Sequence, residues 1–315
     1  MAARSILSAV LLLVLGGQAL AESLRVAVIS DLNGSYGSME YSPRVSAAVE
    51  RIIALDPDLV ISTGDMVAGQ RRPVLSSPEV KAMWQAFHAV VTEPLARAGI
   101  PLLVTPGNHD ASAYGGFEGE RDIFAREWRA RKPAVDFVDD ANYPFFYAFR
   151  IKAVTFVSLD ATTVGPLRNG QAARLRTLAG RDETLIAFSH LPLWPFAIER
   201  ETEVIGDPAL QDLFRAIDLD LHLSGHHHAF YPGWKDGTAF VGQACLGGGT
   251  RRLIGTRVRS AHAITLLEIS ARGDIDITAL SGDAFSEPID WTNLPPRLVH
   301  GSTTLKRLDL APGEH

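Results

Sequence analysis

The sequence predicts an α/β fold in which mixed β-sheets are covered by helices, and three features lead to this expectation. Short runs of aliphatic and β-branched residues alternate with helical patterns along most of the 315 residues, as in proteins that pack helices on sheets. Residues 263–269 and 275–280 flank an Ala-Arg-Gly-Asp turn and predict an antiparallel hairpin, which makes the sheets mixed. With 46% hydrophobic and 21% charged residues, a disordered or fibrous chain is excluded.

The expected elements follow from local patterns: strands at short apolar runs bounded by turn residues, and helices where apolar residues recur every three or four positions. In order, they are strand 24–29, helix 45–55, strand 58–62, helix 80–98, strand 102–105, helix 121–131, the antiparallel strands 147–150 and 153–158, strands 185–189 and 219–224 with a helix before each, and the final hairpin. We expect one domain over residues 22–285. A proline-rich tail over residues 286–315 would either wrap the domain or fray.

The first 21 residues carry the three parts of a secretory signal peptide. Arg4 precedes an apolar run at residues 6–15, and Ala-Leu-Ala at 19–21 forms a cleavage site. The run is too short for an ordinary transmembrane helix; an uncleaved anchor or a buried helix is the alternative. We expect cleavage after Ala21 and a secreted or periplasmic protein that does not stay on the membrane.

Charge and cysteine content exclude several classes of protein. Thirty basic against thirty-six acidic residues give a net charge of −6, which argues against stable binding of nucleic acid or of a membrane surface. Cys245 is the only cysteine, so the chain has no internal disulfide and no cysteine-based zinc or iron–sulfur site. The ten histidines, in contrast, require an explanation.

Five of the expected strands lead directly into residues that can ligate metal ions. The blocks are Asp31-Leu32-Asn33-Gly34, Gly64-Asp65, Gly107-Asn108-His109-Asp110, His190 and Gly225-His226-His227-His228. Because open α/β sheets build their sites at the carboxyl ends of strands, we expect these side chains to meet. Taken singly, Asp31 could cap a helix and His190 could be a buried hydrogen-bonding residue. Three adjacent imidazoles have no such ordinary role.

In this order the blocks resemble the calcineurin-like metallophosphoesterase superfamily, whose pattern is D-x-H, GD, GNH-D/E, H and GH-x-H. The resemblance extends from about Arg25 to Gly233 and implies a four-layer αββα sandwich of two mixed sheets flanked by helices. It also implies two divalent or mixed-valence metal ions of the Mn, Fe or Zn class. By resemblance, the first ion would be bound by Asp31, Asn33, Asp65 and His228, and the second by Asp65, Asn108, His190 and His226, with Asp65 bridging.

The resemblance implies a chemistry as well. A water shared by two cations becomes a hydroxide near neutral pH and can attack phosphorus in line. The bridging Asp65 and His109 would be the catalytic residues, with His109 giving a proton or a hydrogen bond to the departing or equatorial oxygen. We therefore expect a hydrolase of small phosphomonoesters or phosphodiesters, nucleotides or cyclic nucleotides among them. The alternative is a non-catalytic metal or phosphate binder with the same fold.

Two positions depart from the family's pattern. Asn33 stands where the first block usually has histidine, and an amide oxygen is a harder and weaker ligand than imidazole. Asn33 would either ligate the first ion, with a preference shifted towards Mn or Mg, or only orient its neighbours. Ala68 stands where the protein-phosphatase branch carries a further aspartate, which argues against a Ser/Thr protein phosphatase.

Several nearby residues allow two interpretations. The aromatic ones could contact the substrate or pack the loops, and the arginine pairs could hold a second phosphate or be solvated. These residues are Tyr36, Tyr114, Phe117, Trp194 and Phe196, and the pairs Arg71-Arg72 and Arg251-Arg252. Gly247-Gly248-Gly249 predicts a turn between strands. We expect His222 to be structural and His227 to be a spacer whose ring faces substrate or solvent.

Overall fold

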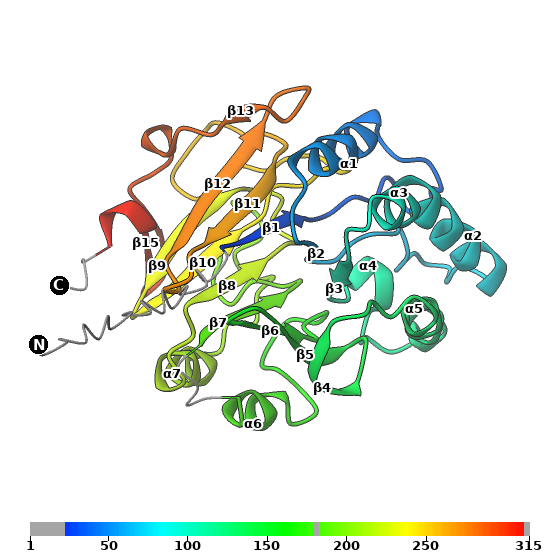
Figure 1. The fold of residues 1–315 in the computed structure, drawn as a ribbon, viewed down its shortest axis with the longest axis horizontal. Coiled ribbons are helices and arrows are strands. Elements are labelled where there is room, and N and C mark those ends of the chain that lie inside the picture. Colours follow the sequence, from blue (N-terminus) through cyan, green and yellow to red (C-terminus); the bar gives the residue numbers. More distant parts are fainter. Residues whose placement is uncertain (1–22, 179–182, 312–315) are drawn as a thin grey trace, which may run out of the picture.

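Two β-sheets form the centre of the protein (Figure 1). The six-stranded sheet has the order β13 (Glu287–Pro288), β12 (Ile275–Ser281), β11 (Ile264–Ile269), β1 (Leu24–Ile29), β2 (Leu59–Ser62) and β3 (Leu102–Val104). The nine-stranded sheet has the order β14 (Arg297–His300), β15 (Thr303–Arg307), β9 (Tyr231–Lys235), β10 (Thr238–Gly242), β8 (Leu221–Ser224), β7 (Thr184–Ser189), β6 (Val154–Leu159), β5 (Phe146–Ile151) and β4 (Asp136–Asn142). This computed structural model describes residues 23–178 and 183–311, so the expected signal peptide lies outside the described residues.

Parallel strands form one half of the first sheet and the middle of the second. β1, β2 and β3 are parallel in the first sheet, and β6, β7, β8 and β10 are parallel in the second. Every residue of β2 and β6 is buried, because both faces of the strand are covered, and this is why these segments are largely apolar without strict alternation. The expected hairpin is β11 and β12, and β11 also pairs antiparallel with β1. The sheets are therefore mixed, as the sequence predicts.

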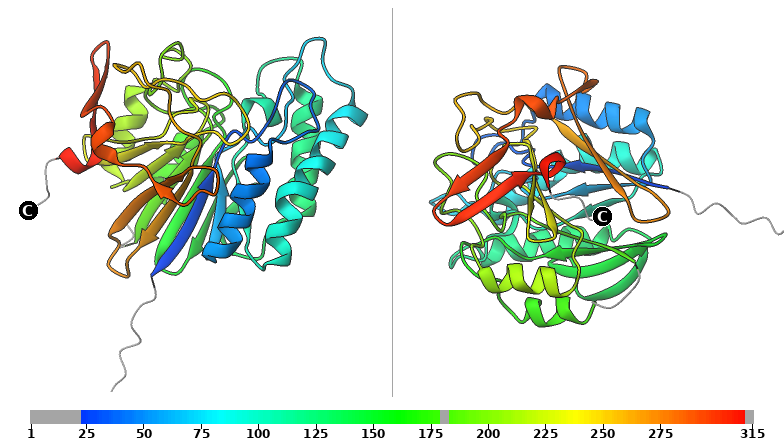
Figure 2. Two further views of the ribbon diagram at one scale, coloured as in Figure 1. Left: turned by 90° about the horizontal axis from the view of Figure 1, so that it is seen from above. Right: turned by 90° about the vertical axis from the view of Figure 1, so that its left-hand side faces the viewer.

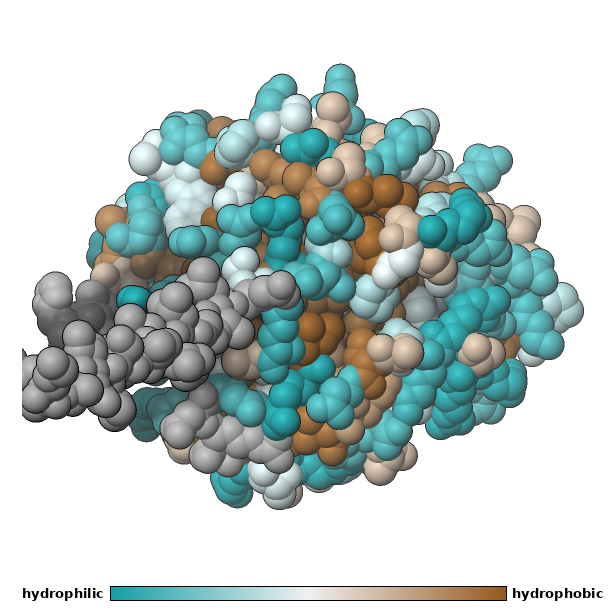
Figure 3. Space-filling model, in the orientation of Figure 1, coloured by the Kyte–Doolittle hydropathy of each residue, from teal (hydrophilic) through white to brown (hydrophobic). Residues whose placement is uncertain are grey.

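Helices form the two outer layers of the four-layer sandwich (Figure 1). The helices against the first sheet are α1 (Pro43–Leu55), α2 (Ser77–Phe87), α3 (Glu93–Arg97) and α5 (Glu118–Ala130), and those against the second are α6 (Gln171–Arg176) and α7 (Pro208–Ala216). One hydrophobic core, with Trp84 and Phe149, fills the space around the first sheet, and another, with Phe214, lies between the second sheet and α6 and α7. On the face drawn in Figure 3, hydrophobic residues gather in the middle and hydrophilic ones cover the side where α2 and α5 lie.

The loops that follow the parallel strands collect at one edge of the sandwich. In the left view of Figure 2, β1 rises from the bottom and these loops gather at the top. β1, β2, β3, β7 and β8 each end directly before one of the five motif blocks. The short helix α4 (Asn108–Ala111) begins within the third block. The topology thus brings together residues that lie up to two hundred positions apart, at the edge where α/β sheets build sites.

The structure differs from the expected elements in several places. The helix expected at residues 80–98 is divided by a π-helical turn, His88–Thr92, between α2 and α3. Pro94 has no N–H to continue the α-helical ladder, which accounts for the wider turn. The sequence did not indicate β4, which is polar and irregularly paired, nor β9 and β10. Pro232 and Gly233 in β9 are residues that strands usually avoid.

The segment from Ser286 onward wraps the sandwich as far as the structure describes it. β13 pairs with β12, and β15 pairs with β14 and β9, so this segment extends both sheets. Arg307 fixes it by donating to the carbonyl oxygens of Trp291 and Leu294 (2.6 and 2.8 Å) and to Asp309. Among the described residues, no helix is both long and apolar enough to span a membrane.

Candidate metal centre

The five motif blocks are tied to one another by backbone hydrogen bonds. Asp31 N donates to Gly64 O (3.0 Å) and Leu32 N to Asp65 O (2.8 Å), which joins the first two blocks. Gly225 N donates to His190 O (3.0 Å), which joins the last two. These bonds satisfy backbone groups that would otherwise be buried without partners, so the positions of the side chains are set by the backbone of neighbouring loops.

Glycines in the blocks allow this close approach. A Cβ at Gly107 would lie 2.1 Å from Asp65 N, and one at Gly225 would lie 2.2 Å from Ser30 Oγ. Both contacts are too close for any side chain. The glycines that precede Asn108 and His226 are therefore packing requirements of the site.

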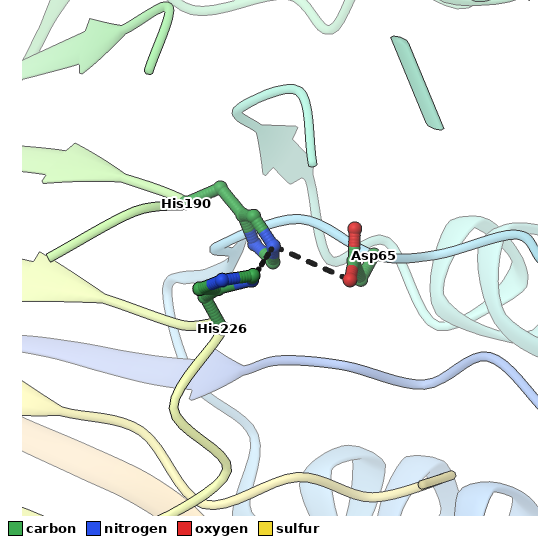
Figure 4. Close-up of side chains that lie close together, drawn as sticks. All are labelled: Asp65, His190 and His226. Atoms are coloured by element: carbon green, nitrogen blue, oxygen red, sulfur yellow. Dashed lines mark hydrogen bonds and ion pairs between the residues drawn. The ribbon is translucent and has the colours of Figure 1, made fainter. Parts of the chain in front are cut away.

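Four ligand atoms converge at one point of this edge. His190 Nε2 lies 2.9 Å from Asn108 Oδ1, 3.3 Å from Asp65 Oδ2 and 3.2 Å from His226 Nδ1. Figure 4 shows the two imidazoles and the carboxylate of Asp65 pointing towards one another. Asp65, His190 and His226 also form the group of His, Cys, Asp or Glu side chains that could hold a metal ion within the described part of the chain. The set expected for the second ion is thus assembled.

Asp31, His228 and Asn33 lie beside this point. Asp31 Oδ1 is 3.1 Å from His228 Nε2 and, buried, accepts no conventional hydrogen bond from the described residues. Asn33 donates from Nδ2 to Val67 O (3.3 Å), which leaves Oδ1 as the atom that could ligate. Asn33, Asp65 and His228 line the same cavity. The structure therefore brings together every residue expected for the first ion as well.

The far nitrogens of the three histidines carry hydrogen bonds that define the tautomers. His190 Nδ1 donates to Thr63 O (2.9 Å), His228 Nδ1 to Gly249 O (2.9 Å) and His226 Nε2 to Glu203 Oε2 (2.8 Å). The other ring nitrogen of each neutral imidazole then presents a lone pair to the site, where oxygen lone pairs also point. Facing acceptors repel unless a cation lies between them. The donor set therefore fits divalent metal ions.

The pKa values of the buried ligand residues also indicate that the site needs positive charge. Burial alone would raise the pKa of Asp65, but His190 and His109 outweigh it and hold that pKa well below its usual range. Burial likewise opposes the charged form of His190, yet Asp65 and Asp31 raise its pKa to about 9. Asp31 similarly raises the pKa of His228 despite burial. In the metal-free chain, protons thus occupy positions that metal ions would take.

Site residues also adopt left-handed backbone conformations. The φ angles of Asp31, Asp65, His226 and His228 are 51°, 55°, 65° and 48°. Such a conformation costs about 1–2 kcal/mol for a residue with a side chain, although Asp and His tolerate it better than most. Strained residues of this kind cluster at functional sites, held by the surrounding structure.

His109 lies at the mouth of the site. Its Nδ1 donates to Gly69 O (2.9 Å), and its Nε2 is 3.8 Å from Asp65 Oδ2. Its backbone N–H donates to Asp65 Oδ1 (2.9 Å). The ring therefore has a fixed orientation, with Nε2 as the nitrogen available to a substrate.

Sequence reasoning missed three residues that hold the ligands in place. Asp110 accepts hydrogen bonds from the backbone N–H groups of Met66 and Val67 (both 2.8 Å) and of Gly107 (2.9 Å), joining the second block to the third. Gln70 Oε1 accepts from Asn108 Nδ2 (2.6 Å), which turns Oδ1 of that amide towards the site. Glu203 orients His226. Asp110 stands inside the third motif block, but no sequence signal marked Gln70 or Glu203.

His227 and His222 have structural roles. His227 is fully buried, with Nδ1 accepting from Phe196 N (3.1 Å) and Nε2 donating to Glu203 O (3.1 Å). The expectation that its ring faces substrate or solvent is therefore wrong: it ties together the loops around the site. His222 is buried in β8 and bonded to Ser189 Oγ (2.8 Å), as expected.

The aromatic loop residues that could either contact the substrate or pack the loops fall into a buried group and an exposed group. Trp194 and Phe196 are buried in the core, as is Phe117, whereas the side chains of Tyr36 and Tyr114 are exposed. Gly247 and its neighbours lie in the long loop from β10 to β11 and pack on the first block, with Gly247 N donating to Asp31 O (2.8 Å).

A cavity of about 340 Å³ opens directly over the ligand atoms. Its walls include His109, Arg200 and Arg251. Arg251 donates to His226 O (2.9 Å), and Arg200 pairs with Glu203 (3.2 Å). The larger hollow of about 590 Å³ beside Ser23 lies elsewhere and contains none of the motif residues. The cavity thus combines a metal-binding floor with two guanidinium groups.

The calcineurin-like phosphoesterase family model matches residues 24–230 of the chain. The search of curated proteins found no match to the chain. Among solved structures, a purple acid phosphatase, PPD1 from yellow lupin (Lupinus luteus), is similar with a TM-score of 0.64 at 17% identity over 86% of this chain. That match covers 53% of the lupin protein, so the chain spans about half of its length.

Two further structures are similar in fold. A dimetal phosphatase from Danio rerio has a TM-score of 0.60 at 14% identity, with 84% of this chain and 98% of that one covered. GAP50, the anchor in the inner membrane complex of Plasmodium, has a TM-score of 0.52 at 14% identity, with 82% and 84% covered. At these identities the likeness is one of fold alone.

The glycine requirement can be tested with a matched pair of variants. Gly107→Ala should destabilise the protein by about 1–3 kcal/mol through overpacking and should displace Asp65, lowering the metal content measured by elemental analysis. Gly249→Ala is the control, because a Cβ there would meet no atom within 4 Å. Equal metal content and equal unfolding free energies in the two variants would show that the close approach is not required.

The protonation of the site predicts a pH dependence of metal binding. Because the pKa of His190 is raised to about 9 in the metal-free chain, a metal ion must displace its proton at any lower pH. The apparent affinity for Mn²⁺ should therefore rise with pH between 6 and 8, by about tenfold per unit for each displaced proton. Calorimetry in buffers of different ionisation enthalpy measures both affinity and proton release. A flat affinity without proton release over this range would refute the assignment of His190.

Proposed function

The chain belongs to the calcineurin-like phosphoesterase family, and we propose that it is a hydrolase that cleaves small phosphomonoesters with two metal ions. The observation that carries this proposal is the meeting of His190, Asn108, Asp65 and His226 beneath a cavity that two arginines border. A phosphomonoester brings more negative charge to this cavity than a phosphodiester does. Diesters are then the poorer substrates.

The metal ions would be held by the two ligand groups described above. Asp31, Asn33, Asp65 and His228 would hold one, and Asp65, Asn108, His190 and His226 the other, with Asp65 shared. When bound, the ions supply a water nucleophile at neutral pH and stabilise negative charge on the phosphoryl oxygens. The oxygen- and nitrogen-rich set suits Mn, Fe or Zn.

The protein's own residues bind and orient the phosphoryl group. Arg251 and Arg200 border the cavity, and Arg200 Nε is a buried donor without a hydrogen-bond partner in the described structure. Guanidinium groups bind phosphate oxygens through charge-assisted hydrogen bonds. These donors would fix the phosphoryl group over the ligand atoms, in the cavity that His109 also lines.

His109 is the candidate acid. With Nδ1 bound to Gly69 O, a protonated ring has its other N–H, at Nε2, directed to the cavity. That N–H can give a proton or a hydrogen bond to the departing oxygen. The ring of Tyr36, whose centroid is 5.0 Å away, covers one side of it and limits its motion.

The alternative function is that of a non-catalytic metal or phosphate binder. The fold alone does not exclude it, since GAP50 is named as an anchor. What supports catalysis is the set of side chains: a proton donor at the cavity mouth and ligands with defined tautomers. A binder would need neither His109 nor its bond to Gly69.

Activity assays separate the two functions. The Mn²⁺-loaded protein should hydrolyse p-nitrophenyl phosphate faster than bis(p-nitrophenyl) phosphate. His109→Ala should lower kcat by about 10²–10⁴-fold with unchanged metal content, whereas Asp65→Asn should lower metal content too. His300→Ala, an exposed residue on β14, is the control. If neither ester is hydrolysed between pH 5 and 9, the protein is a binder.

We also propose that the protein is exported and acts outside the cytoplasm. The support is the signal-like sequence of residues 1–21 together with the start of β1 at Leu24. Cleavage after Ala21 would remove no residue of the sheets. The mature protein from an extracellular or periplasmic fraction should therefore begin at Glu22 by mass spectrometry of its N-terminal peptide. Full-length protein confined to the cytoplasm would contradict export.

A further inference from the structure

We propose that a groove beside the metal cavity binds the leaving group of the substrate and selects one that carries both an aromatic ring and a second anionic group. A nucleoside bisphosphate has this chemistry. The proposal rests on the proposed phosphomonoesterase function and names the class of substrate for it.

The groove is a separate hollow of about 640 Å³ that shares two wall residues with the metal cavity. It is lined by Tyr36, Gln70, Arg71, Arg72, Tyr114 and Phe117, and Tyr36 and Gln70 also line the cavity. A substrate whose phosphoryl group lies over the ligand atoms can therefore extend past His109 into the groove. The shared residues show that the two hollows adjoin each other.

Two tyrosine rings in the groove are exposed although the chain buries most of its aromatic residues. Tyr36 and Tyr114 are 58% and 44% exposed as residues. The Tyr114 hydroxyl accepts from Val164 N (3.2 Å), so that ring is held in place at the groove wall. Tyr36 lies against His109 on one side. Positioned, exposed aromatic rings are surfaces on which a base or another aromatic ring stacks.

Two guanidinium groups supply the positive charge of the groove. Arg72 is fixed, because it lies over the ring of Phe117 (4.8 Å) and donates to Gly115 O (3.1 Å). Arg71 makes no hydrogen bond or ion pair with any residue in the described ranges. Its acidic neighbour Glu79 is already bound to Ser76 N and Oγ (2.7 Å each). One arginine is thus preorganised and the other is available to an anionic ligand.

The combination of features distinguishes this groove from the other hollows. The hollow at Trp128 is mostly apolar and remote from the motif blocks, and the one at Ser23 is polar without exposed aromatic rings. Only a substrate with both a ring and a second charge would use the tyrosines and the arginines together. The phosphoryl group that is cleaved is held in the adjoining cavity.

Four substrates separate the contributions of ring and charge. Glycerol 2-phosphate has neither, phenyl phosphate has a ring only, fructose 1,6-bisphosphate has a second charge only, and adenosine 3′,5′-bisphosphate has both. The wild-type protein should show its highest kcat/KM for the last. Arg71→Ala should lower kcat/KM for the two bisphosphates relative to phenyl phosphate by about tenfold. Tyr36→Leu should lower kcat/KM for phenyl phosphate and adenosine 3′,5′-bisphosphate, which carry a ring, relative to kcat/KM for glycerol 2-phosphate.

The controls distinguish failure of this proposal from failure of the proposed function. Arg215→Ala removes an exposed arginine on α7, which pairs with Asp212, and should leave all ratios unchanged. In a His109→Ala background, calorimetry should show adenosine 3′,5′-bisphosphate binding about tenfold more weakly when Arg71→Ala is added. If glycerol 2-phosphate is hydrolysed but Arg71→Ala changes no ratio and no affinity, the groove proposal is overturned and the phosphoesterase remains. If no ester is hydrolysed, the proposed function fails.

Discussion

The candidate metal centre depends on positive charge between oxygen and nitrogen atoms whose lone pairs face one another. The carboxylates of Asp31 and Asp65 are buried beside the lone pairs of His190, His226 and His228, an arrangement that repels itself unless positive charge neutralises it. In the metal-free chain protons do so, as the raised pKa of His190 shows. Metal ions do the same with stronger bonds. The need for a cation explains why both aspartates and all three histidines have second partners that fix their orientation.

The fold supports this arrangement at a cost in backbone freedom. Asp31, Asp65, His226 and His228 all have positive φ, and Gly107 and Gly225 leave no room for a side chain. Such local costs persist only where surrounding structure enforces them. Here the enforcement comes from parallel strands that are covered on both faces and from loops that hydrogen-bond one another. The rigid sandwich is thus what makes a strained, charged edge possible.

The sequence predicts most of this fold because its signals are local. β1 was predicted to the residue, and the hairpin of β11 and β12 nearly so, since apolar runs and turn residues lie within a few positions. β4 escaped prediction because it is polar, and β9 because Pro232 and Gly233 mask it. At the site, motif spacing identified the residues that meet, but not Gln70 or Glu203. Their roles come from contacts with Asn108 and His226, and no local pattern records contacts across tens of residues.

The net charge, like the local sequence patterns, does not record which distant residues meet. It also bears on the choice of substrate. A chain of charge −6 gives no hint of an anion site, yet Arg200 and Arg251 border the metal cavity and Arg71 and Arg72 line the adjoining groove. A field inside a cleft depends on the charges that line it and on the low-dielectric walls around it. Acidic residues elsewhere on the surface are screened beyond about 10 Å at ordinary ionic strength. The gathering of four arginines at one edge of an acidic protein is therefore a consequence of which loops the parallel strands bring together, and under the proposed function it would favour substrates with more than one negative group.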